Sequence, residues 1–214
     1  MEQKVNASIE NEISEMQVHN PRFLENESIE FAIENPAKVE EVLNNFSGVR
    51  AYSMRTKATG MASTAHSGNG VMINGIHPDN EKLVSAIHSK LIEGSYFEQE
   101  SRIPSIIISQ KTAEHMKTGL GKKVVLTTTS LSGETAQGLF RVEGIFRTSN
   151  TVFDELNVFI QSAPLQTMVA PDSNIVSEVA IRFHENTDIE EAMDAIRTAL
   201  PGMSVQNRKE VAPA

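Results

Sequence analysis

The side chains that most often carry chemistry in proteins are present in this sequence, but their spacing does not assemble a site. No two histidines are placed as H-x-x-x-H or H-E-x-x-H, the patterns that would put two imidazoles on one metal ion. We therefore expect scattered surface or turn histidines and no metal site. There is no cysteine, which removes disulfides, thiolate catalysis and cysteine-ligated metals. The six histidines are His19, His66, His77, His88, His115 and His184.

The carboxylates, glycines and serines lead to the same expectation. The pairs Glu40–Glu41 and Glu190–Glu191 fall at predicted helix starts, where they complement the helix dipole, and adjacent helical residues do not converge on one point. The glycine- and lysine-rich segment 119–123 lacks the P-loop spacing and the Ser or Thr after the lysine, which favours a turn. The sequence therefore predicts no catalytic residue, no cofactor and no enzyme activity. The serines that lack the G-x-S-x-G context of a nucleophile include Ser63, Ser67 and Ser109.

Composition limits the classes of partner. The 214 residues include 19 Lys and Arg against 28 Asp and Glu, a formal net charge of −9 at pH 7. This acidity argues against binding to nucleic acid or to an anionic membrane surface, since both need concentrated positive charge. No run of about 20 apolar residues is present, and residues 1–20 lack the apolar core of a signal peptide. We therefore expect an excised piece of a longer protein if the chain works outside the cytoplasm.

A β-rich stretch, residues 103–161, organises the middle of the chain. The β-branched run Ile106 to Ile108 predicts a buried strand, and residues 110–117 predict a short helix that Gly119 and Gly121 end. Strand patterns follow at residues 124–129, 139–146 and 156–161, with a turn at Gly133. The pattern is typical of a compact, mainly β module.

The two flanks each show a strand, a helix and a strand. In the first, residues 28–33 alternate like a half-buried strand, Asn35 and Pro36 predict a helix start, Gly48 predicts a left-handed helix end, and residues 49–55 predict the second strand. In the second, residues 176–183 predict a strand, Thr187 with Glu190 predicts a capping box, and a helix and a strand at 203–206 follow. Two such units packed together form a ferredoxin-like sandwich with helices on one face. We therefore predict an α+β fold, a split ferredoxin-like domain with an inserted β-rich subdomain.

Three further segments complete the secondary-structure expectations. Residues 5–16 predict an amphipathic helix, because Val5, Ile9, Ile13 and Met16 recur at helical spacing. Residues 56–70 are small and polar and predict either a long hairpin or a flexible loop. A strand at 71–76, a turn at 77–80 and a short helix within 81–92 are expected to lead into the insert.

Several segments then resemble one family, in the order in which that family carries them. Residues 71–79 are similar to its "v-x-G-v-x-P" segment, residues 91–97 to "l-x-x-G-x-y-f", and residues 140–146 to "f-x-V-v-G-i-f". The family is the extracytoplasmic domain of FtsX-like ABC transporter permeases, which include the MacB exporters and the lipoprotein-releasing LolC and LolE group. Asn207 and Arg208 depart from the family's usual "t-W" near the end. The other similar segments are residues 16–23, 106–126, 154–160 and 205–213.

The resemblance implies a fold and a function. It implies a porter-like subdomain at residues 1–82 and 174–214, with a membrane-proximal helix at its start, and an inserted sabre-like subdomain at residues 83–173. It implies a periplasmic domain at the bacterial inner membrane that transmits ATP-driven movement to extract or export a lipoprotein, peptide or small molecule. The implied partners are a second permease subunit, in a homodimer or heterodimer, a cytoplasmic ATPase, and a periplasmic protein or lipoprotein cargo.

Two loops are the candidate partner contacts. The first is the loop 148–154, in which Asn150, Val152, Phe153 and Asp154 are the predicted site residues. Phe153 is an apolar side chain in a polar loop, which suits an anchor in an interface, although it could equally pack back on the insert. The second is the segment 56–70. The alternatives are a periplasmic ligand-binding domain, which requires a deep pocket where the two parts meet, and a hydrolase, which requires converging Ser, His and carboxylate groups.

Overall fold

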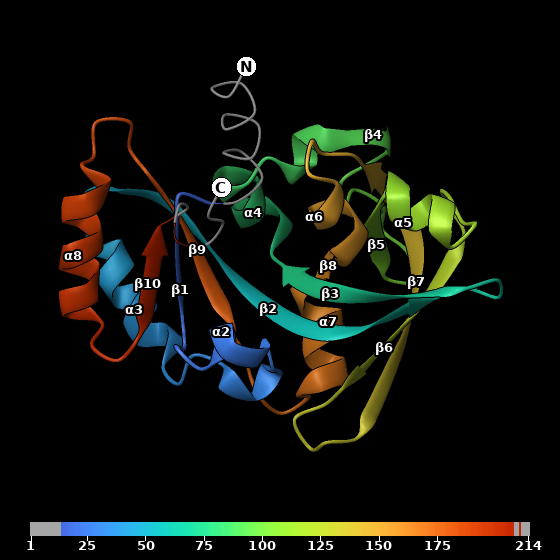
Figure 1. Ribbon diagram of the computed structural model, residues 1–214, viewed down its shortest axis with the longest axis horizontal. Helices are drawn as coiled ribbons and strands as arrows, with labels where there is room; N and C mark the ends of the chain where they lie inside the picture. Colours follow the sequence, from blue (N-terminus) through green and yellow to red (C-terminus); the bar gives the residue numbers. More distant parts are fainter. Residues whose placement is uncertain (1–13, 208–209, 211–214) are drawn as a thin grey trace.

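The protein is a mixed α+β molecule, as the sequence predicts, and its described residues form a ten-stranded sheet. The computed structural model describes residues 14–207 and residue 210. The order of the strands is β10-β1-β9-β2-β3-β8-β5-β7-β4, and β6 pairs with both β2 and β7 (Figure 1). Within the described residues, no helix has both the length and the apolar character that crossing a bilayer requires. The strands are β1 (Met16–His19), β2 (Val49–Ser63), β3 (Gly68–Ile76), β4 (Leu91–Gly94), β5 (Ser105–Ser109), β6 (Lys123–Thr129), β7 (Thr135–Phe146), β8 (Asn157–Gln161), β9 (Glu178–Phe183) and β10 (Ser204–Asn207).

One end of the sheet has the ferredoxin-like arrangement. Its chain order is β1, α3, β2, then β9, α8, β10, and its spatial order is β10-β1-β9-β2 with antiparallel neighbours. The helices α3 and α8 pack on each other, and their apolar faces close a core that includes Val39, Leu43, Ile181 and Ile196. The two halves of this unit come from opposite ends of the chain, so the split that the sequence predicts is present. The α-helices are α2 (Phe23–Asn26), α3 (Pro36–Asn44), α4 (Pro78–Val84), α5 (Gln110–His115), α6 (Thr151–Leu156), α7 (Ser162–Val169) and α8 (Ile189–Ala199).

The identity of the first strand differs from the prediction. Residues 28–33 contain the 3₁₀ helix Ile29–Phe31 instead of a strand, because the Ser28 side chain accepts a hydrogen bond from the Glu30 amide and so starts a tight turn. The first strand is β1, all four of whose residues are buried between β9 and β10. Met16, expected at the end of a helix, therefore lies in a strand, and residues 5–13 of that expected helix lie outside the described residues.

The helix ends follow local side-chain chemistry, with two corrections. Asn35 caps α3 as predicted, accepting a hydrogen bond from the Lys38 amide at 3.1 Å. Gly48 is not a left-handed cap, since α3 already ends at Asn44 with a right-handed residue after it. The cap of α8 is Asp188, which accepts from the Glu190 and Glu191 amides, and not the expected Thr187. Aspartate is the stronger acceptor, and the Thr187 hydroxyl instead donates to the Gly48 carbonyl.

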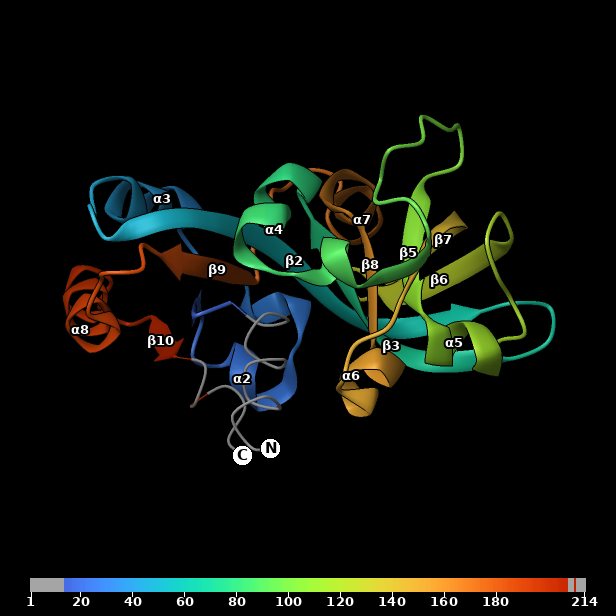
Figure 2. The ribbon, with the colours of Figure 1, turned by 90° about the horizontal axis from the view of Figure 1, so that it is seen from above.

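The segment 56–70 is a hairpin and not a loop. β2 is 15 residues long, and its first half pairs with β9 while its second half pairs with β3 and β6. A single strand therefore runs from the ferredoxin-like end to the opposite end of the molecule (Figures 1 and 2). The predicted division into residues 1–82, 83–173 and 174–214 stays a prediction.

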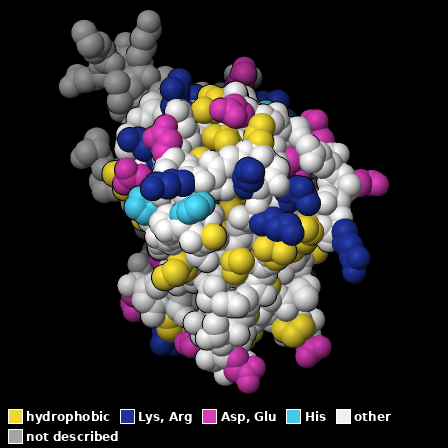
Figure 3. All heavy atoms as spheres, turned by 90° about the vertical axis from the view of Figure 1, so that its right-hand side faces the viewer, with side chains coloured by type: hydrophobic (Ala, Val, Ile, Leu, Met, Phe, Trp, Pro, Cys, Tyr) yellow, Lys and Arg dark blue, Asp and Glu magenta, His cyan; other side chains and the backbone are white. Residues whose placement is uncertain are grey.

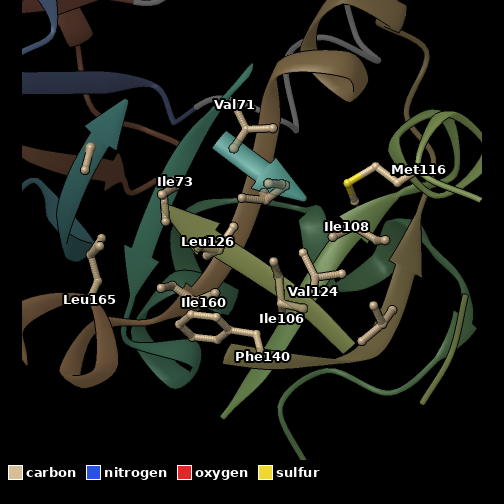
Figure 4. Packing of buried hydrophobic residues seen from close by; sticks show 14 of the residues in the cluster. Val71, Ile73, Ile106, Ile108, Met116, Val124, Leu126, Phe140, Ile160 and Leu165 are labelled. Atoms are coloured by element: carbon tan, nitrogen blue, oxygen red, sulfur yellow. The ribbon is translucent and has the colours of Figure 1, made fainter. Parts of the chain in front are cut away.

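The second end of the sheet encloses its own core. Parallel pairs join β3 to β8 and β5 to β7, and antiparallel pairs join β5 to β8 and β6 to β7. Figure 4 shows side chains from several of these strands, among them Ile106, Leu126, Phe140 and Ile160, pointing toward one another. The strand-helix-strand reading of residues 103–129 is confirmed, since α5 follows β5 directly and β6 comes next.

The approach to the insert contains a helix where a turn was expected. Pro78 opens α4, since its missing amide and fixed φ suit the first helical turn. The expected helix within residues 81–92 is wrong, because that segment holds the end of α4, the 3₁₀ helix Ile87–Lys90 and β4. The supposed apolar stripe does not form, since Leu83 is exposed while Glu81 is fully buried.

Candidate functional site

The predicted contact loop forms the start of a short helix. Asn150 caps α6 by accepting a hydrogen bond from the Phe153 amide at 3.0 Å. Asp154 is buried, and its carboxylate accepts from the amide and the hydroxyl of Thr148. The Ser109 hydroxyl donates to the main-chain carbonyl of Asp154. Asn150 and Asp154 therefore fix the shape of this loop and are occupied within the fold.

The two apolar residues of the loop have different environments. The Phe153 ring lies 6.3 Å from the rings of both Phe146 and Phe159, so it packs back on the insert. Val152 keeps 65% of its surface exposed, and Leu156, one helical turn later, keeps 50%. Residues four apart lie on the same side of a helix. The accessible apolar surface at this loop is therefore Val152 with Leu156, and the sequence reasoning did not select Leu156.

The other candidate contact, the segment 56–70, is tied to α5 at its tip. The Thr64 hydroxyl donates to the Met116 carbonyl at 3.0 Å, and the Ser67 hydroxyl donates to the His115 carbonyl at 2.9 Å. These bonds hold the tip of the β2–β3 hairpin against the helix that follows β5. The hairpin is a fixed part of the surface.

The feature that sequence reasoning missed is a buried ion network where the two ends of the sheet meet. The guanidinium of Arg55 donates to both carboxylate oxygens of Glu81, at 3.0 Å and 2.6 Å, and to Glu178 at 2.6 Å. Lys57 donates to the second oxygen of Glu178 at 3.2 Å, and the Ser53 hydroxyl donates to Glu81. Arg55 lies on β2, Glu81 on α4 and Glu178 on β9. The network therefore joins α4 to β9, a strand of the ferredoxin-like unit.

The electrostatic environment keeps these groups charged. Burial by itself raises the pKa of the Glu178 carboxyl, but attraction to Lys57 and Arg55 outweighs it and lowers that pKa to about 2. Burial likewise opposes ionisation of Glu81, and the charge and hydrogen bonds of Arg55 outweigh it, so the pKa of Glu81 is lowered. Burial disfavours the charged form of Arg55, but the two carboxylates raise its pKa overall. At neutral pH the network is fully ionised and internally compensated.

A buried histidine stands beside this network. His19 on β1 is directly opposite Glu178 on β9, and its side chain is almost fully buried. Burial lowers the pKa of His19, and this effect exceeds the opposing attraction to Glu178. The ring is therefore neutral at pH 7. It packs against Phe23 in an edge arrangement, which is the role of a core aromatic residue.

The same junction contains a small cavity. Its volume is about 220 Å³. Pockets for small-molecule ligands are usually about 300–1,000 Å³, so this cavity lies below that range. Three of its charged side chains, Arg55, Lys57 and Glu81, are already held in the ion network. The cavity is lined by Gln17, Glu27, Arg55, Lys57, Met72, Asn74, Glu81, Ile87, Phe153, Leu156, Asn157 and Phe159.

The serines weighed as nucleophiles have structural roles. Ser63 donates to the Val125 carbonyl and Ser67 to the His115 carbonyl, while Ser109 caps α5 by accepting from the Thr112 amide. Across residues 14–207 and residue 210, no group of three or more His, Asp and Glu is placed to hold a metal ion. The expectation that the chain carries no catalytic or metal site stays a prediction.

A signal for the network exists in the sequence, although it is weak. Arg55 and Lys57 alternate with uncharged residues along a strand, and Glu178 opens a strand in which the next three residues are apolar. A long charged side chain at alternate strand positions is compatible with a solvated face, so the pattern alone does not separate a buried charge from an exposed one. The partners are 26 and 123 residues away from Arg55, beyond the reach of any local pattern.

Comparison with known proteins identifies the family to which this fold corresponds. The family of MacB-like periplasmic core domains matches residues 1–199. The periplasmic region of MacB from Actinobacillus actinomycetemcomitans is similar in structure, with a TM-score of 0.61 at 12% sequence identity, over 98% of this chain and 96% of that one. The extracellular domain of the ABC-type transporter YknZ from Gram-positive bacteria is also similar, with a TM-score of 0.56 at 16% identity, over 90% of this chain and 99% of that one.

A third structure has the same fold. It is a domain of a putative permease protein from Porphyromonas gingivalis, with a TM-score of 0.52 at 12% identity, over 96% of this chain and 94% of that one. No curated protein sequence matches this chain. The family match extends over most of the sequence, and the neighbours share the fold over nearly their whole length. This chain therefore belongs to the family of MacB-like periplasmic core domains.

Proposed function

We propose that this chain is the periplasmic arm of an ABC transporter permease, and that it passes movement driven by ATP hydrolysis to a cargo outside the membrane. The solved neighbours are described as the periplasmic region of MacB and the extracellular domain of an ABC-type transporter, which supports the transporter context. The cargo we propose is a lipoprotein, a peptide or a small molecule, and a lipoprotein-releasing role like that of the LolC and LolE group is compatible with the family. The arm has no chemistry of its own in this proposal.

The observation that carries the proposal is the adjacency of the first and last described strands. Met16 on β1 is the register partner of Asn207 on β10, and the two strands are antiparallel. The chain therefore enters and leaves the domain at neighbouring points of the same sheet. A domain held at two adjacent points moves as one body with whatever segments hold it, which is the geometry that a lever needs.

A lever must also be stiff, and the junction supplies that stiffness. β2 passes without a break from the ferredoxin-like end to the opposite end of the sheet, where it pairs with β3 and β6, and the ion network joins α4 to β9 between these two ends. Bending at the junction would separate Arg55 from one of its two carboxylates and leave a buried charge uncompensated, which is costly. Movement applied at β1 and β10 is therefore carried to the far end instead of being absorbed between the two parts.

Three finer statements belong to this proposal. We place the porter-like subdomain at residues 1–82 and 174–214 and the sabre-like subdomain at residues 83–173. The partners are a second permease subunit, a cytoplasmic ATPase and a periplasmic protein or lipoprotein cargo. The contact predicted at residues 148–154 is made by Val152 in this proposal, because Val152 has the largest exposed apolar surface among the four predicted site residues.

The test follows distances within the intact transporter. Because the chain has no cysteine, a single introduced cysteine carries the only spin label in this domain. The label is placed at exposed Val152 in permease subunits reconstituted with their ATPase in nanodiscs, and the distance between the two arms is measured by pulsed electron paramagnetic resonance. A second label at exposed Asp194 on α8, paired with Val152 in one chain, reports the internal geometry.

The expected result is a shift of several ångströms in the distance between arms on trapping with ATP and vanadate, with an unchanged distance inside each arm. An ATPase variant that binds but does not hydrolyse ATP serves as the control for the hydrolysed state. Identical distance distributions between arms in all nucleotide states would refute the lever. A change confined to the internal distance would refute the rigid arm.

A further inference from the structure

The charge of this chain is distributed very unevenly. Residues 101–147 contain seven Lys and Arg against three Asp and Glu, a net charge of +4. Since the whole chain carries −9, the remaining residues together carry −13. Figure 3 shows most of the Lys and Arg side chains of this end of the molecule on the upper half of the face, next to hydrophobic side chains and with Asp and Glu side chains among and around them. The overall acidity hides this local positive surface.

The positive charge is concentrated on the outer side of the β6–β7 hairpin. Lys123 is directly opposite Arg141, and Val125 is directly opposite Leu139. Directly opposite residues of an antiparallel pair lie on the same side of the sheet, and the intervening Val124 is fully buried, so this side faces outward. We define the basic face as Lys122, Lys123, Val125, Leu139 and Arg141.

The cations of the basic face have no carboxylate partner among the described residues, although the Arg141 guanidinium donates to the Gly121 carbonyl at 3.4 Å. Two like charges directly opposite each other across a strand pair are destabilising, so Lys123 and Arg141 cost the fold some stability where they are. The buried Nε of Arg141 has no acceptor within the described part of the chain. Leu139 keeps 42% of its surface exposed beside these charges. Such a surface suits an acidic partner that also presents an apolar side chain.

A surface of that complementary type lies on this same chain. We define the acidic face as Glu185, Asp188, Ile189, Glu190 and Glu191, at the start of α8. All five are exposed, and Ile189 keeps 37% of its surface exposed. Asp188 caps the helix, while Glu185, Glu190 and Glu191 form no salt bridge in the described residues. The acidic face has free carboxylates around one exposed isoleucine.

One chain cannot bring these two faces together. α8 lies at one end of the longest axis of the molecule, and the β6–β7 hairpin lies in the other half (Figure 1). Two copies placed side by side with their long axes antiparallel make the contact twice, as a two-fold axis requires. We propose that the basic face docks on the acidic face of a second copy of this chain. This inference rests on the proposed function, in which two permease subunits pair, and it names the surfaces through which they pair.

The strength of the contact follows from its exposure. Ion pairs at a protein surface are individually weak, so two free copies associate weakly and the association falls as salt is added. Two arms of one transporter are different, because tethering gives each an effective concentration in the millimolar range. A contact too weak for a stable dimer in solution is then populated on the membrane. The test must detect a weak complex.

The experiment uses the chain alone, so its outcome does not depend on transport. A nitroxide label is attached at Gln137→Cys, an exposed position on β7 on the same side of the sheet as Leu139. The labelled chain is mixed in low salt with an equal amount of ¹⁵N-labelled chain that carries no nitroxide. We expect selective broadening of the amides at the start of α8, around residues 188–192, and loss of that broadening in 0.5 M salt. Broadening elsewhere, or none, overturns the proposal.

Charge reversal provides the decisive comparison. Lys123→Glu should weaken the association at least tenfold, and so should Glu190→Lys, while a mixture of these two variants should recover the broadening. Lys82→Glu, an equal change of charge at an exposed cation of α4, should have no effect. Lys123→Glu should also raise the melting temperature, because it replaces a like-charge pair with an attractive one. A folded Lys123→Glu chain that still associates normally refutes the contact.

A remaining outcome concerns lipid. If the wild-type chain binds vesicles containing phosphatidylglycerol, Lys123→Glu abolishes that binding, and no broadening occurs between copies, the basic face belongs to a membrane surface and the proposed pairing is wrong. The nucleotide-dependent distances described above are measured separately. If the pairing of the two faces is refuted, the proposal that the domain transmits movement is unaffected. If that proposal is refuted, the pairing can still be tested with the isolated chain.

Discussion

Replacing Arg55 with methionine is expected to lower the stability of this protein more than almost any other single change. The guanidinium is the shared partner of two buried carboxylates, Glu81 and Glu178, which are 0% and 2% exposed. Methionine keeps the length and most of the volume but removes the charge, so it leaves Glu81 without a cation and Glu178 with Lys57 alone. Breaking a buried ion pair from one side costs about 3–5 kcal/mol. For a domain of this size that corresponds to a fall in melting temperature of roughly 10 °C.

The dependence of this cost on pH tests its electrostatic origin. The folded-state pKa of Glu178 is about 2, below the ordinary 4.5, and that of Glu81 is also lowered, so their stabilising effect is complete above pH 4.5 and is lost as the pH falls toward 2. In the Arg55→Met chain, burial of Glu81 is no longer offset, so its pKa rises above the ordinary value. That carboxyl then takes up a proton in mildly acidic solution, which removes the uncompensated charge. The difference in unfolding free energy between wild type and variant should therefore be largest at pH 7 and smaller at pH 4.

Urea unfolding followed by circular dichroism at the two pH values measures this difference. Lys38→Met is the matched control, since it removes a cation from an exposed salt bridge with Glu41, and it should change the free energy by less than about 1 kcal/mol at either pH. A second control, Glu81→Gln added to Arg55→Met, should recover part of the loss at pH 7. An Arg55→Met cost below about 1 kcal/mol, or one that is equal at pH 7 and pH 4, would show that the network does not hold the junction together.

Three further changes test particular contacts. Phe153→Ala should lower the free energy of unfolding by about 2–4 kcal/mol, because it removes a ring from a packed aromatic cluster. Val152→Ser should leave the urea midpoint unchanged, so it is the cleaner probe of partner binding in a transport assay. Equal urea midpoints for the two variants would contradict this packing. Gly94→Ala should destabilise by more than about 1 kcal/mol in the same assay, since Gly94 has φ of +81° and an added Cβ would clash with the Glu143 carbonyl oxygen. A neutral effect would mean that β4 is placed differently. Asn35→Ala should cost about 1 kcal/mol through loss of the α3 cap, with Asn35→Asp close to wild type, and a neutral alanine would show that this cap is not formed.

The resemblance to the permease family and the split fold could be read from the sequence because both rest on the order of local patterns. The buried strand at Ile106 to Ile108, the helix after it and the turn at Gly133 each depend on a few neighbouring residues. The prediction of the first strand was wrong because it also relied on a local pattern. Ser28 to Ile33 alternates like a strand, and the Ser28 cap makes this segment begin a 3₁₀ helix instead. Four-residue β1 has too short a pattern to be recognised before its neighbours β9 and β10 are known.

The candidate site was also only partly predictable from local sequence patterns. The sequence indicated the loop at residues 148–154, but Phe153 is turned inward by Phe146 and Phe159, and these contacts come from separate strands. Lys123 and Arg141, which form no salt bridge in the described part of the chain, are 18 residues apart in the sequence. They are recognised as parts of one face only when the register of β6 and β7 is known.

By itself, the sequence determined where Asn35 and Pro36 begin a helix, and that two units of strands and a helix flank a β-rich insert, although it misplaced the first strand of the first unit. Only the tertiary structure decided that Arg55, Glu81 and Glu178 meet in a buried network and that Lys123 and Arg141 share one face of the β6–β7 hairpin. The physical reason is range. Capping and periodicity act over a few residues of one segment, whereas the partner of a buried charge is chosen by how distant segments pack, and the same charged residue in a strand is equally suited to water until that packing is known.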